Sequence, residues 1–569
     1  MHNRLKCRSR SAFAGTAILL LAPLAAPLAF AQEKVDASTI ERIKDEAMNR
    51  SQVMEIASWL SDVYGPRLTW SPNVQKAANW AMGEMKKWGL VNVRLEDWDT
   101  PAGLGWQNDR FSMNVVSPSS FIVEAVPRAW SPGTKGVVTG QAVRVEAGCL
   151  NEAKPRYAGK LRNAFILVAD PVNAAVNEFA PSATRYADST LARMAAATLD
   201  AAGRGGRAGF GRGGAVPVRS AICQQQFTAD SIAAASSGRG GRGGFGGRGG
   251  FSPTDVSVLN WLAAEGAGAV LLGDARHTGG VIGTDNGSPR TPDAPQVAVV
   301  HLAQESYGRI ARMIEKKVPV TISLDMKNTF FPANKSSFNI LGEIPGTDPA
   351  LKDEVVMIGA HFDSWHSGTG ATDNAAGSGV MLEAMRILKA LDLKPRRTIR
   401  IALWTGEEQG LLGSRAYAAK HFGTSDESGF HPAAEQERIA AYFNVDNGSG
   451  KIRGVYLQGI EAERPIFDAW MGPFKAIGMN TLTISNTGGT DHLSYISAGL
   501  PGFQFIQDPL DYDTKTHHTN QDVFERLQPD DMKFNSAVVA AFAWQAAQRD
   551  EKLPRPPMPG PTGGRGGIP

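Results

Sequence analysis

The sequence predicts an α/β fold in which helices cover both faces of a mainly parallel, mixed sheet. From about residue 330 to residue 549, short apolar runs alternate with segments whose apolar residues recur at helical spacing. Such alternation is typical of parallel sheets, because each connection between parallel strands must cross a face of the sheet. Residues 131–328, which precede this region, contain short β-like runs instead. They predict a β-rich domain inserted into the main domain.

The first 31 residues predict a cleavable signal peptide. Four basic residues precede an apolar, Ala-rich stretch at 12–30, and Ala29-Phe30-Ala31 fits the small-residue cleavage pattern. An uncleaved membrane anchor is the alternative, although two prolines interrupt the apolar run. We therefore expect a periplasmic or secreted protein that is not held at a membrane after cleavage.

Two helical patterns open the mature chain, at residues 35–59 and 73–88, and an alternating strand pattern follows at 91–98. These helices have no partner of their own to pack against. We therefore assign residues 32–130 to the N-terminal part of the main domain, whose larger part spans residues 329–549.

Low-complexity segments lie within the predicted insertion and at the end of the chain. Residues 203–214 and 237–251 are Gly-Arg-Gly-Gly repeats, and residues 550–569 are rich in Pro and Gly. Similar repeats occur in RNA-binding tails. The net charge of this chain is only +3, however, from 59 basic and 56 acidic residues, so we expect no nucleic acid partner. We expect flexible surface loops and a disordered tail.

Two of the three cysteines remain after signal cleavage. Cys149 and Cys223 could form one disulfide in an oxidising compartment, and nothing in the sequence decides whether they do.

The main domain contains candidate strands whose carboxyl ends carry polar residues. Open α/β sheets bind ligands at these strand ends. The candidate strands are residues 355–360, 398–404, 440–445, 454–458, 481–485 and 502–506. The helical patterns between and after them are residues 379–391, 410–422, 464–477, 491–497 and 529–548.

Metal-ligating side chains follow the first candidate strand. His361 comes directly after the apolar run, and Asp363 follows where its carboxylate can hold the imidazole ring. Asp373 lies in a Gly- and Ala-rich turn that would let a metal approach closely. Its two oxygens suit a carboxylate that bridges two ions.

Two adjacent acids follow the second candidate strand. Neighbouring residues leave a strand in different directions, so Glu408 can bind a metal while Glu407 faces the attacking water as a general base. The alternative is a pair of solvated acids at the start of a helix. Asp446 follows the third candidate strand, and His518 near the C-terminus offers a second imidazole.

This set of ligands predicts a two-metal site. Two imidazoles and three carboxylates, one of them shared, suit two Zn²⁺ ions about 3.5 to 4 Å apart. Co²⁺ or Mn²⁺ could substitute for zinc in similar geometry. The predicted ligands are His361, Asp373, Glu408, Asp446 and His518.

Five motifs resemble those of the M28 family of co-catalytic zinc exopeptidases. They are HFDS, ATDNAAGSG, WTGEEQGLLGS, NVDN and HHTNQD, in this order. The combination of HFDSW, LWTGEEQG, GGTDH and HHTNQD is most similar to the carboxypeptidase Q branch. The resemblance covers residues 335–549, and it implies that residues 131–328 are a protease-associated domain. Members of this branch often form dimers, so a homodimer is a further expectation.

The resemblance also implies a role for each ligand. His361 and Asp446 would complete one zinc site, Glu408 and His518 would complete the other, and Asp373 would bridge the two ions. Many members have an aromatic residue where this chain has a second histidine directly before His518. Either imidazole could therefore be the ligand, although the family's spacing favours His518.

Two further expectations come from the family. Asp363 would hold the ring of the ligand His361 without binding a metal itself, and Glu407 would be the general base. The peptide bond Asp373-Asn374, after the bridging acid, would be cis.

The resemblance implies an exported di-zinc exopeptidase that acts at the free end of short peptides or splits dipeptides. Aminopeptidase or dipeptidase action is favoured, and carboxypeptidase action is the alternative. Two other classes stay open, a non-catalytic binding protein on this scaffold and a glutaminyl cyclase-type acyltransferase with one zinc ion. The complete set of ligands speaks against both.

Overall fold

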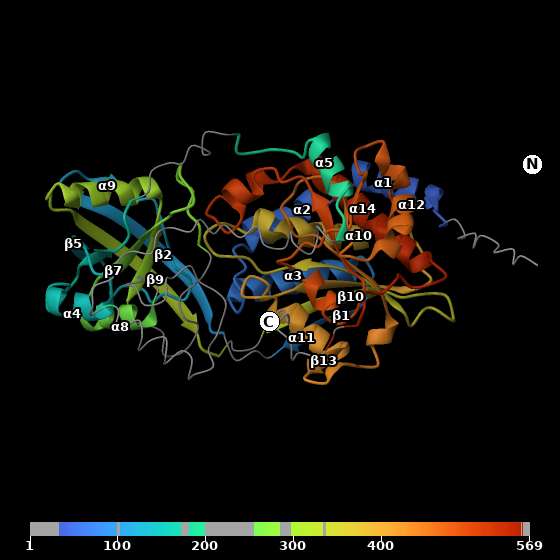
Figure 1. Cartoon of the computed structure of the whole chain (residues 1–569), viewed down its shortest axis with the longest axis horizontal. Coiled ribbons are helices and arrows are strands. Elements are labelled where there is room, and N and C mark those ends of the chain that lie inside the picture. The colour runs from blue at the N-terminus through green and yellow to red at the C-terminus, as the bar shows by residue number, and fades with distance from the viewer. Residues whose placement is uncertain are drawn as a thin grey trace, which may run out of the picture.

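The computed structural model describes residues 33–98, 103–171, 181–199, 223, 255–284, 297–333, 337–558 and 560. The described residues form two lobes that lie side by side along the long axis of the molecule (Figure 1). Each lobe is built around one eight-stranded sheet. The predicted signal peptide and both Gly/Arg-rich segments lie outside the described residues.

The sheet of the larger lobe is mixed and mostly parallel. Its strands follow the order β1-β10-β12-β11-β15-β18-β16-β17. β12, β11, β15 and β18 run parallel to one another at the centre, whereas β1, β10 and β16 add antiparallel pairings. Their bounds are β1 (Val91–Trp98), β10 (Ser337–Ile344), β11 (Val355–His361), β12 (Thr398–Trp404), β15 (Ile439–Asn444), β16 (Ile452–Tyr456), β17 (Thr481–Thr483) and β18 (Gly502–Gln507). The sequence pattern anticipated all of these except β10.

Side chains of the central strands alternate between two apolar cores. In β11, Val356 and Ile358 enter one core, whereas Val355 and Met357 enter the other. Strands buried on both faces read as continuous apolar runs, which is why these were recognisable. The first core is covered by α1 (Ala37–Asn49), α2 (Val53–Ser58), α3 (Pro72–Lys87), α10 (Ala376–Ala390), α12 (Arg464–Lys475) and α14 (Pro529–Gln548). The second is covered by α11 (Leu412–His421) and α13 (His492–Ile496).

The smaller lobe also has helices on both faces of its sheet. Its strands are β2 (Gly105–Ser117), β3 (Phe121–Ile122), β4 (Ala125–Pro127), β5 (Val138–Arg144), β6 (Phe165–Leu167), β7 (Ala269–Gly273), β8 (Ala298–Leu302) and β9 (Thr321–Phe331). Helix α9 (Gln304–Glu315) packs on one face. Helices α4 (Leu150–Tyr157) and α8 (Val256–Ala264) pack on the other.

The predicted boundary at residue 131 is too late. β2, β3 and β4 precede it, yet all three pair within the sheet of the smaller lobe, which therefore extends from residue 105 to residue 331. β2 pairs along its whole length with β9, from Gly105 opposite Phe331 to Ser117 opposite Thr321. Local periodicity cannot reveal a partner so distant in sequence.

One helix from the middle of the predicted insertion lies on the larger lobe instead. Helix α5 (Asp188–Ala195) sits at the top of that lobe in Figure 1. Just before it, Arg185 forms ion pairs with Asp508 at 3.0 Å and Asp531 at 2.7 Å. The insertion is therefore joined to the larger lobe by the chain where it enters and leaves, and it also contacts that lobe through Arg185 and α5.

The predicted C-terminal tail begins later than residue 550. Leu553 is buried at 3 % exposure, and its backbone N–H donates to the Ala440 carbonyl at 3.3 Å. Arg555 donates to the side-chain oxygen of Gln436 at 2.7 Å. The segment after α14 is thus packed beside β15 for several residues, because its apolar and basic side chains find partners there.

Two further features concern the environment of the chain. Cys149 and Cys223 form a disulfide with their Cα atoms 5.3 Å apart. Among the residues that the structure describes, no helix is both long enough and apolar enough to cross a bilayer.

A buried acid gives a pH-dependent prediction for stability. Burial raises the pKa of Glu463 to about 9, with Arg549 opposing this shift and Glu33 adding to it. Between the unfolded value of about 4.3 and this raised value, the folded state holds a proton that the unfolded chain releases. The free energy of unfolding should therefore fall as pH rises through this window.

Glu463→Gln should remove that dependence. Its melting temperature should exceed that of the wild type by more at pH 8 than at pH 5, measured by thermal unfolding at both values. Glu461→Gln, in the same turn but exposed, is the matched control and should show no comparable change. An equal effect of Glu463→Gln at both pH values would contradict the raised pKa.

Candidate metal centre

The carboxyl ends of three central strands meet at one edge of the larger sheet. In the parallel register of β11 with its neighbours, His361 lies opposite Trp404 of β12, and Gly359 lies opposite Asn444 of β15. Residues that follow these strands must therefore lie close together. Glu407 and Asp446 are two such residues.

The imidazole of His361 faces two carboxylates. Its Nδ1 lies 3.0 Å from the backbone carbonyl of Asp363. A carbonyl only accepts hydrogen bonds, so Nδ1 carries a proton and donates it there. Nε2 lies 3.0 Å from Asp446 Oδ1 and 3.1 Å from Asp373 Oδ1. Nε2 is therefore the nitrogen that faces the carboxylates and could bind a metal in their place.

A second imidazole faces the other oxygen of Asp373. His518 Nε2 lies 3.4 Å from Asp373 Oδ2 and 2.9 Å from Glu408 Oε2. Both oxygens are buried, and neither receives a hydrogen bond of normal geometry from the described residues. Buried carboxylate oxygens without donors are costly. Divalent cations between these oxygens and the two imidazoles would remove this cost, and the mixed nitrogen and oxygen donors suit zinc.

The other histidine of the pair lies differently. The ring of His517 stacks on Tyr512, with ring centroids 4.8 Å apart, and is largely exposed to solvent. It lies near Asp373 as well, but the short contact with Glu408 belongs to His518. The geometry therefore favours His518 as the ligand.

Asp373 is held in place by its neighbours. The peptide bond Asp373-Asn374 is cis. The backbone N–H groups of Thr372 and Asp373 donate to the carboxylate of Asp522, at 2.5 Å and 3.3 Å. Asn374 Nδ2 donates to the Val445 carbonyl at 2.9 Å. Asp522 thus fixes the turn that presents Asp373, a role that its sequence context did not reveal.

The carboxylate of Asp363 does not hold the His361 ring in the expected way. Its Oδ1 lies 3.7 Å from His361 Nδ1, so the backbone carbonyl of Asp363 makes the closer contact. The carboxylate instead accepts from Thr69 Oγ1 at 2.6 Å and from the Glu407 N–H at 3.3 Å. Asp363 therefore ties the segment after β11 to the segment after β12.

The cluster carries more acid than base, and this shifts its pKa values. Burial raises the pKa of Glu407 well above its ordinary value, and the charges of Asp446 and Asp491 add to this. Burial also raises the pKa of Glu408 well above its ordinary value, with Asp373 adding to it. Burial by itself would lower the pKa of His361, but the charges of Asp446 and Glu407 outweigh it and raise this pKa. So much negative charge in one buried place favours cations.

A buried arginine close to this cluster was not predicted from the sequence to support the site. Arg67 is 0 % exposed. It donates to the carbonyls of Leu60 at 2.6 Å, Phe362 at 2.7 Å and Gly370 at 2.9 Å. Burial lowers its pKa to about 10, opposed by the charges of nearby acids that include Asp522. Arg67 therefore fixes the backbone at Phe362, next to His361, and at Gly370, shortly before Asp373. In the sequence it shows only as part of a turn.

Asp491 and His492 lie beside the cluster. His492 Nε2 is 3.0 Å from Gln458 Nε2 and 3.2 Å from the Thr487 carbonyl. Asp491 is 0 % exposed. Among the described residues, neither side chain forms a hydrogen bond or ion pair with a predicted ligand, so we place both as neighbours of the site.

Parts of the chain are similar to known peptidases. Residues 339–543 match the family described as Peptidase family M28. This match spans the larger lobe from β10 to α14. Carboxypeptidase Q of Mus musculus is 31 % identical over 261 residues, which is 46 % of this chain and 52 % of that protein. Aminopeptidase YwaD of Bacillus subtilis is 27 % identical over 225 residues, which is 38 % of this chain and 47 % of that protein. The chain thus spans about half the length of these curated relatives.

A solved structure covers both lobes. The crystal structure of a peptidase M28 precursor from Shewanella amazonensis has a TM-score of 0.59 and 23 % sequence identity, and the match covers 92 % of this chain and 99 % of that chain. At this identity the likeness shows the fold alone.

Removing the shared carboxylate should empty the centre. Because the two oxygens of Asp373 face different imidazoles, Asp373→Ala should lose both ions together, measured as metal per chain after dialysis in zinc. Asp513→Ala removes an exposed carboxylate from the same part of the chain and should keep the metal content of the wild type. An Asp373→Ala variant that retains two ions would show that this residue is not shared.

Proposed function

We propose that this chain is an exported metallo-exopeptidase that uses two zinc ions to hydrolyse the peptide bond at the free end of short peptides. The observation that carries the proposal is the position of Asp373, whose two oxygens face His361 and His518 separately. Sites that share one carboxylate between two ions are typical of hydrolases. Single-zinc acyltransferases have no need for such a bridge.

Each ion would be held by a separate pair of side chains and by the shared acid. His361 and Asp446 would hold the first ion, and Glu408 and His518 would hold the second. When bound, the two ions polarise the scissile carbonyl and lower the pKa of the attacking water.

Glu407 would act as the general base. Burial raises its pKa, which brings a carboxylate closer to the value at which it both accepts and returns a proton near neutral pH. Its backbone N–H is held by Asp363 at 3.3 Å. Glu407 would take the proton of the attacking water and pass it to the leaving nitrogen, while Asp363 fixes the segment that carries it.

We favour aminopeptidase or dipeptidase action on short peptides, with carboxypeptidase action as the alternative. The curated relatives include both a carboxypeptidase Q and an aminopeptidase, so similarity supports either end of the substrate. A non-catalytic binding protein is less favoured, because such a protein would not need a general base beside the complete set of ligands.

The proposal extends to the compartment and the smaller lobe. The sequence of the first 31 residues predicts export. The disulfide between Cys149 and Cys223 supports it, since disulfides persist in oxidising compartments. We also propose that the smaller lobe is a protease-associated domain and that the mature protein is soluble, with a homodimer as its assembly.

Removing the base should separate binding from chemistry. Glu407→Gln should keep two zinc ions and lower kcat by about 100- to 10,000-fold, because the ligands remain while the proton acceptor is lost. Metal content and steady-state hydrolysis would both be measured, with the exposed Glu525→Gln as the matched control. Turnover near that of the wild type would refute the role of Glu407.

A panel of small substrates tests the activity itself. It contains a free dipeptide, its N-acetylated form, its C-terminal amide and an aminoacyl-anilide, each with and without a chelator. Chelator-sensitive cleavage of the amide and the anilide, but not of the acetylated peptide, would mean aminopeptidase action. Cleavage of the free dipeptide alone would mean dipeptidase action, and cleavage of the acetylated form would mean carboxypeptidase action. No cleavage with two ions bound would overturn the proposal.

A further inference from the structure

The two proposed ions differ in how their ligands are supported. His361 ends β11, and Asp446 follows β15 by two residues, so both lie beside central strands of the sheet. His518 comes much later after its nearest strand, β18, which ends at Gln507. We call residues 508–520 the His518 loop. A ligand on a loop needs support from outside to hold its geometry.

Residues 280–284, here called the second brace, support the His518 loop near the ligand. Gly283 forms an antiparallel bridge with Thr519. The Thr284 N–H donates to the carbonyl of His518 itself at 2.9 Å. The side chain of Asn520 completes the contact, because its Oδ1 accepts from Ile282 N at 2.7 Å and its Nδ2 donates to the carbonyl of residue 280 at 3.0 Å.

Residues 182–186, here called the first brace, support the other end of the same loop. The Thr184 N–H donates to the Leu510 carbonyl at 2.9 Å. Thr514 Oγ1 donates to the carbonyl of residue 182 at 2.6 Å. Arg185 pairs with Asp508, which is itself 0 % exposed, at 3.0 Å. Both braces lie in connections between strands of the smaller lobe. The first brace lies between β6 and β7, and the second brace lies between β7 and β8.

The two braces meet the loop at its two left-handed residues. Leu510 has φ 47° and His518 has φ 58°. Residues other than glycine adopt this backbone region only where their surroundings hold them. In both cases the brace donates an N–H to the carbonyl of the left-handed residue. The braces are therefore placed where the loop most needs an external partner.

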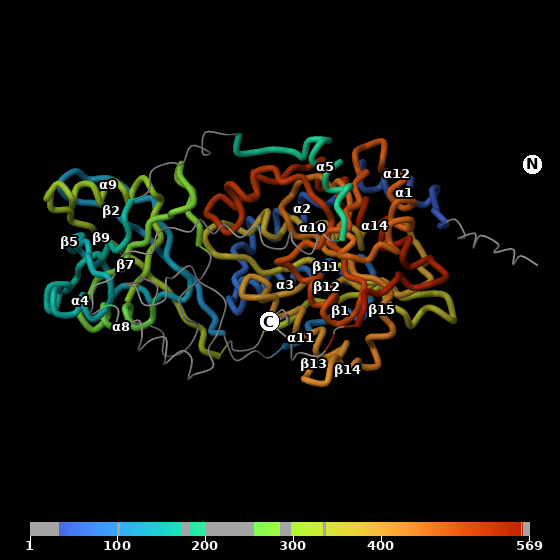
Figure 2. Tube along the Cα trace, viewed as in Figure 1, coloured from blue at the N-terminus to red at the C-terminus, as the bar shows by residue number. Residues whose placement is uncertain are grey.

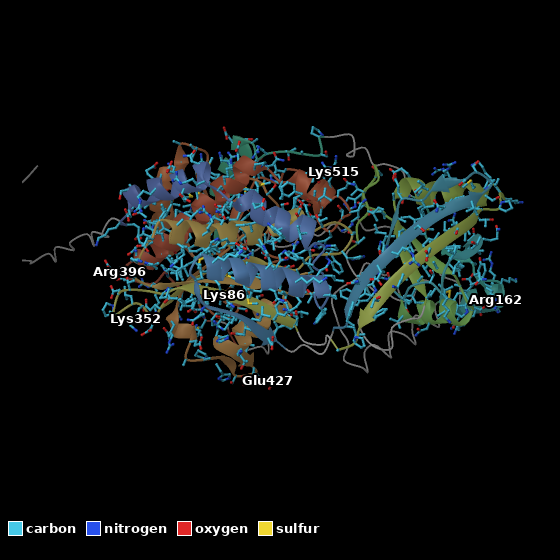
Figure 3. The ribbon with its side chains drawn as sticks, turned by 180° about the vertical axis from the view of Figure 1, so that it is seen from behind. Lys86, Arg162, Lys352, Arg396, Glu427 and Lys515 are labelled. Carbon is cyan, nitrogen blue, oxygen red and sulfur yellow. A yellow bond between two sulfur atoms is a disulfide. The ribbon has the colours of Figure 1, made fainter. Side chains whose placement is uncertain are left out.

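The position of the loop in the molecule agrees with these contacts. Lys515, at the centre of the His518 loop, lies at the edge of the larger lobe that adjoins the smaller lobe (Figure 3). The light-green part of the chain before residue 284 extends from the smaller lobe toward this edge (Figure 2). The smaller lobe thus reaches the loop that carries His518.

We propose that Asn520 is a positioning residue for the second zinc ion, and that the two braces make the affinity of that ion depend on the insertion. The proposal rests on the proposed two-metal centre and goes beyond it. Asn520 contacts neither ion. It holds the second brace against the peptide of His518, so the imidazole stays directed at Glu408 and Asp373. His361 and Asp446, which would hold the first ion, form no hydrogen bond or ion pair with either brace among the described residues.

The test is zinc binding by full-length Asn520→Ala, measured by competition with a chromophoric chelator that resolves two ions. One of the two ions should bind about 10- to 100-fold more weakly than in the wild type, as expected when a supporting residue is lost, while the other keeps its affinity. Asn520→Asp keeps the oxygen that accepts from Ile282 N. Its affinity for the weakened ion should therefore lie between those of the wild type and Asn520→Ala. Arg185→Ala, at the other brace, should weaken the same ion.

Asn108→Ala is the matched control. Among the described residues, the Asn108 side chain bonds only within the smaller lobe, including Asn328 Oδ1 at 2.7 Å, so both ions should bind as in the wild type. Circular dichroism of each variant checks folding, and Asn520→Asp serves if Asn520→Ala does not fold.

Three results would overturn the proposal. They are an unchanged affinity for both ions in Asn520→Ala, an equal loss of both, or the same effect in Asn108→Ala. A wild-type chain that binds fewer than two ions would instead overturn the two-metal centre itself, so the two failures are distinguishable.

Discussion

One carboxylate, that of Asp373, faces two imidazoles, His361 and His518, that lie far apart in the sequence. His361 reaches it from the end of β11, and His518 reaches it from a loop near the C-terminus. The acids packed near these imidazoles make one another's negative charge more costly in a buried place, and positive charge between them compensates for it. The geometry of the centre therefore depends on how firmly Asp373 is held.

The surrounding structure holds this residue from several directions. Asp522 accepts from the backbone on the N-terminal side of the cis bond, and Asn374 anchors the other side to the segment after β15. Arg67 fixes the backbone below by donating to several carbonyls. These partners are polar groups that carry out no chemistry themselves, and they are what allow a crowded acidic site to keep one arrangement.

The sequence predicted elements that depend on local residue patterns. It did not predict contacts between residues that are far apart in the chain. Buried central strands read as apolar runs, so β11 and β12 were placed nearly to the residue, and polar residues directly after them pointed to one sheet edge. β10 was missed, and the boundary of the smaller lobe was placed too late, because β2 finds its partner β9 only in three dimensions. For the same reason the contacts of Arg67, Asp522 and Asn520 could not be predicted from the sequence, since their partners lie far away along the chain. The carboxylate of Asp363 was expected to contact the His361 ring, but the backbone of the same residue makes the closer contact.

The most direct measurement is anomalous X-ray diffraction at the zinc absorption edge from crystals of the zinc-loaded protein. The account predicts two peaks on either side of Asp373, one beside His361 and Asp446 and one beside Glu408 and His518, about 3.5 to 4 Å apart. A single peak, or a second peak whose nearest ligand is His517 or a residue outside this cluster, would contradict it.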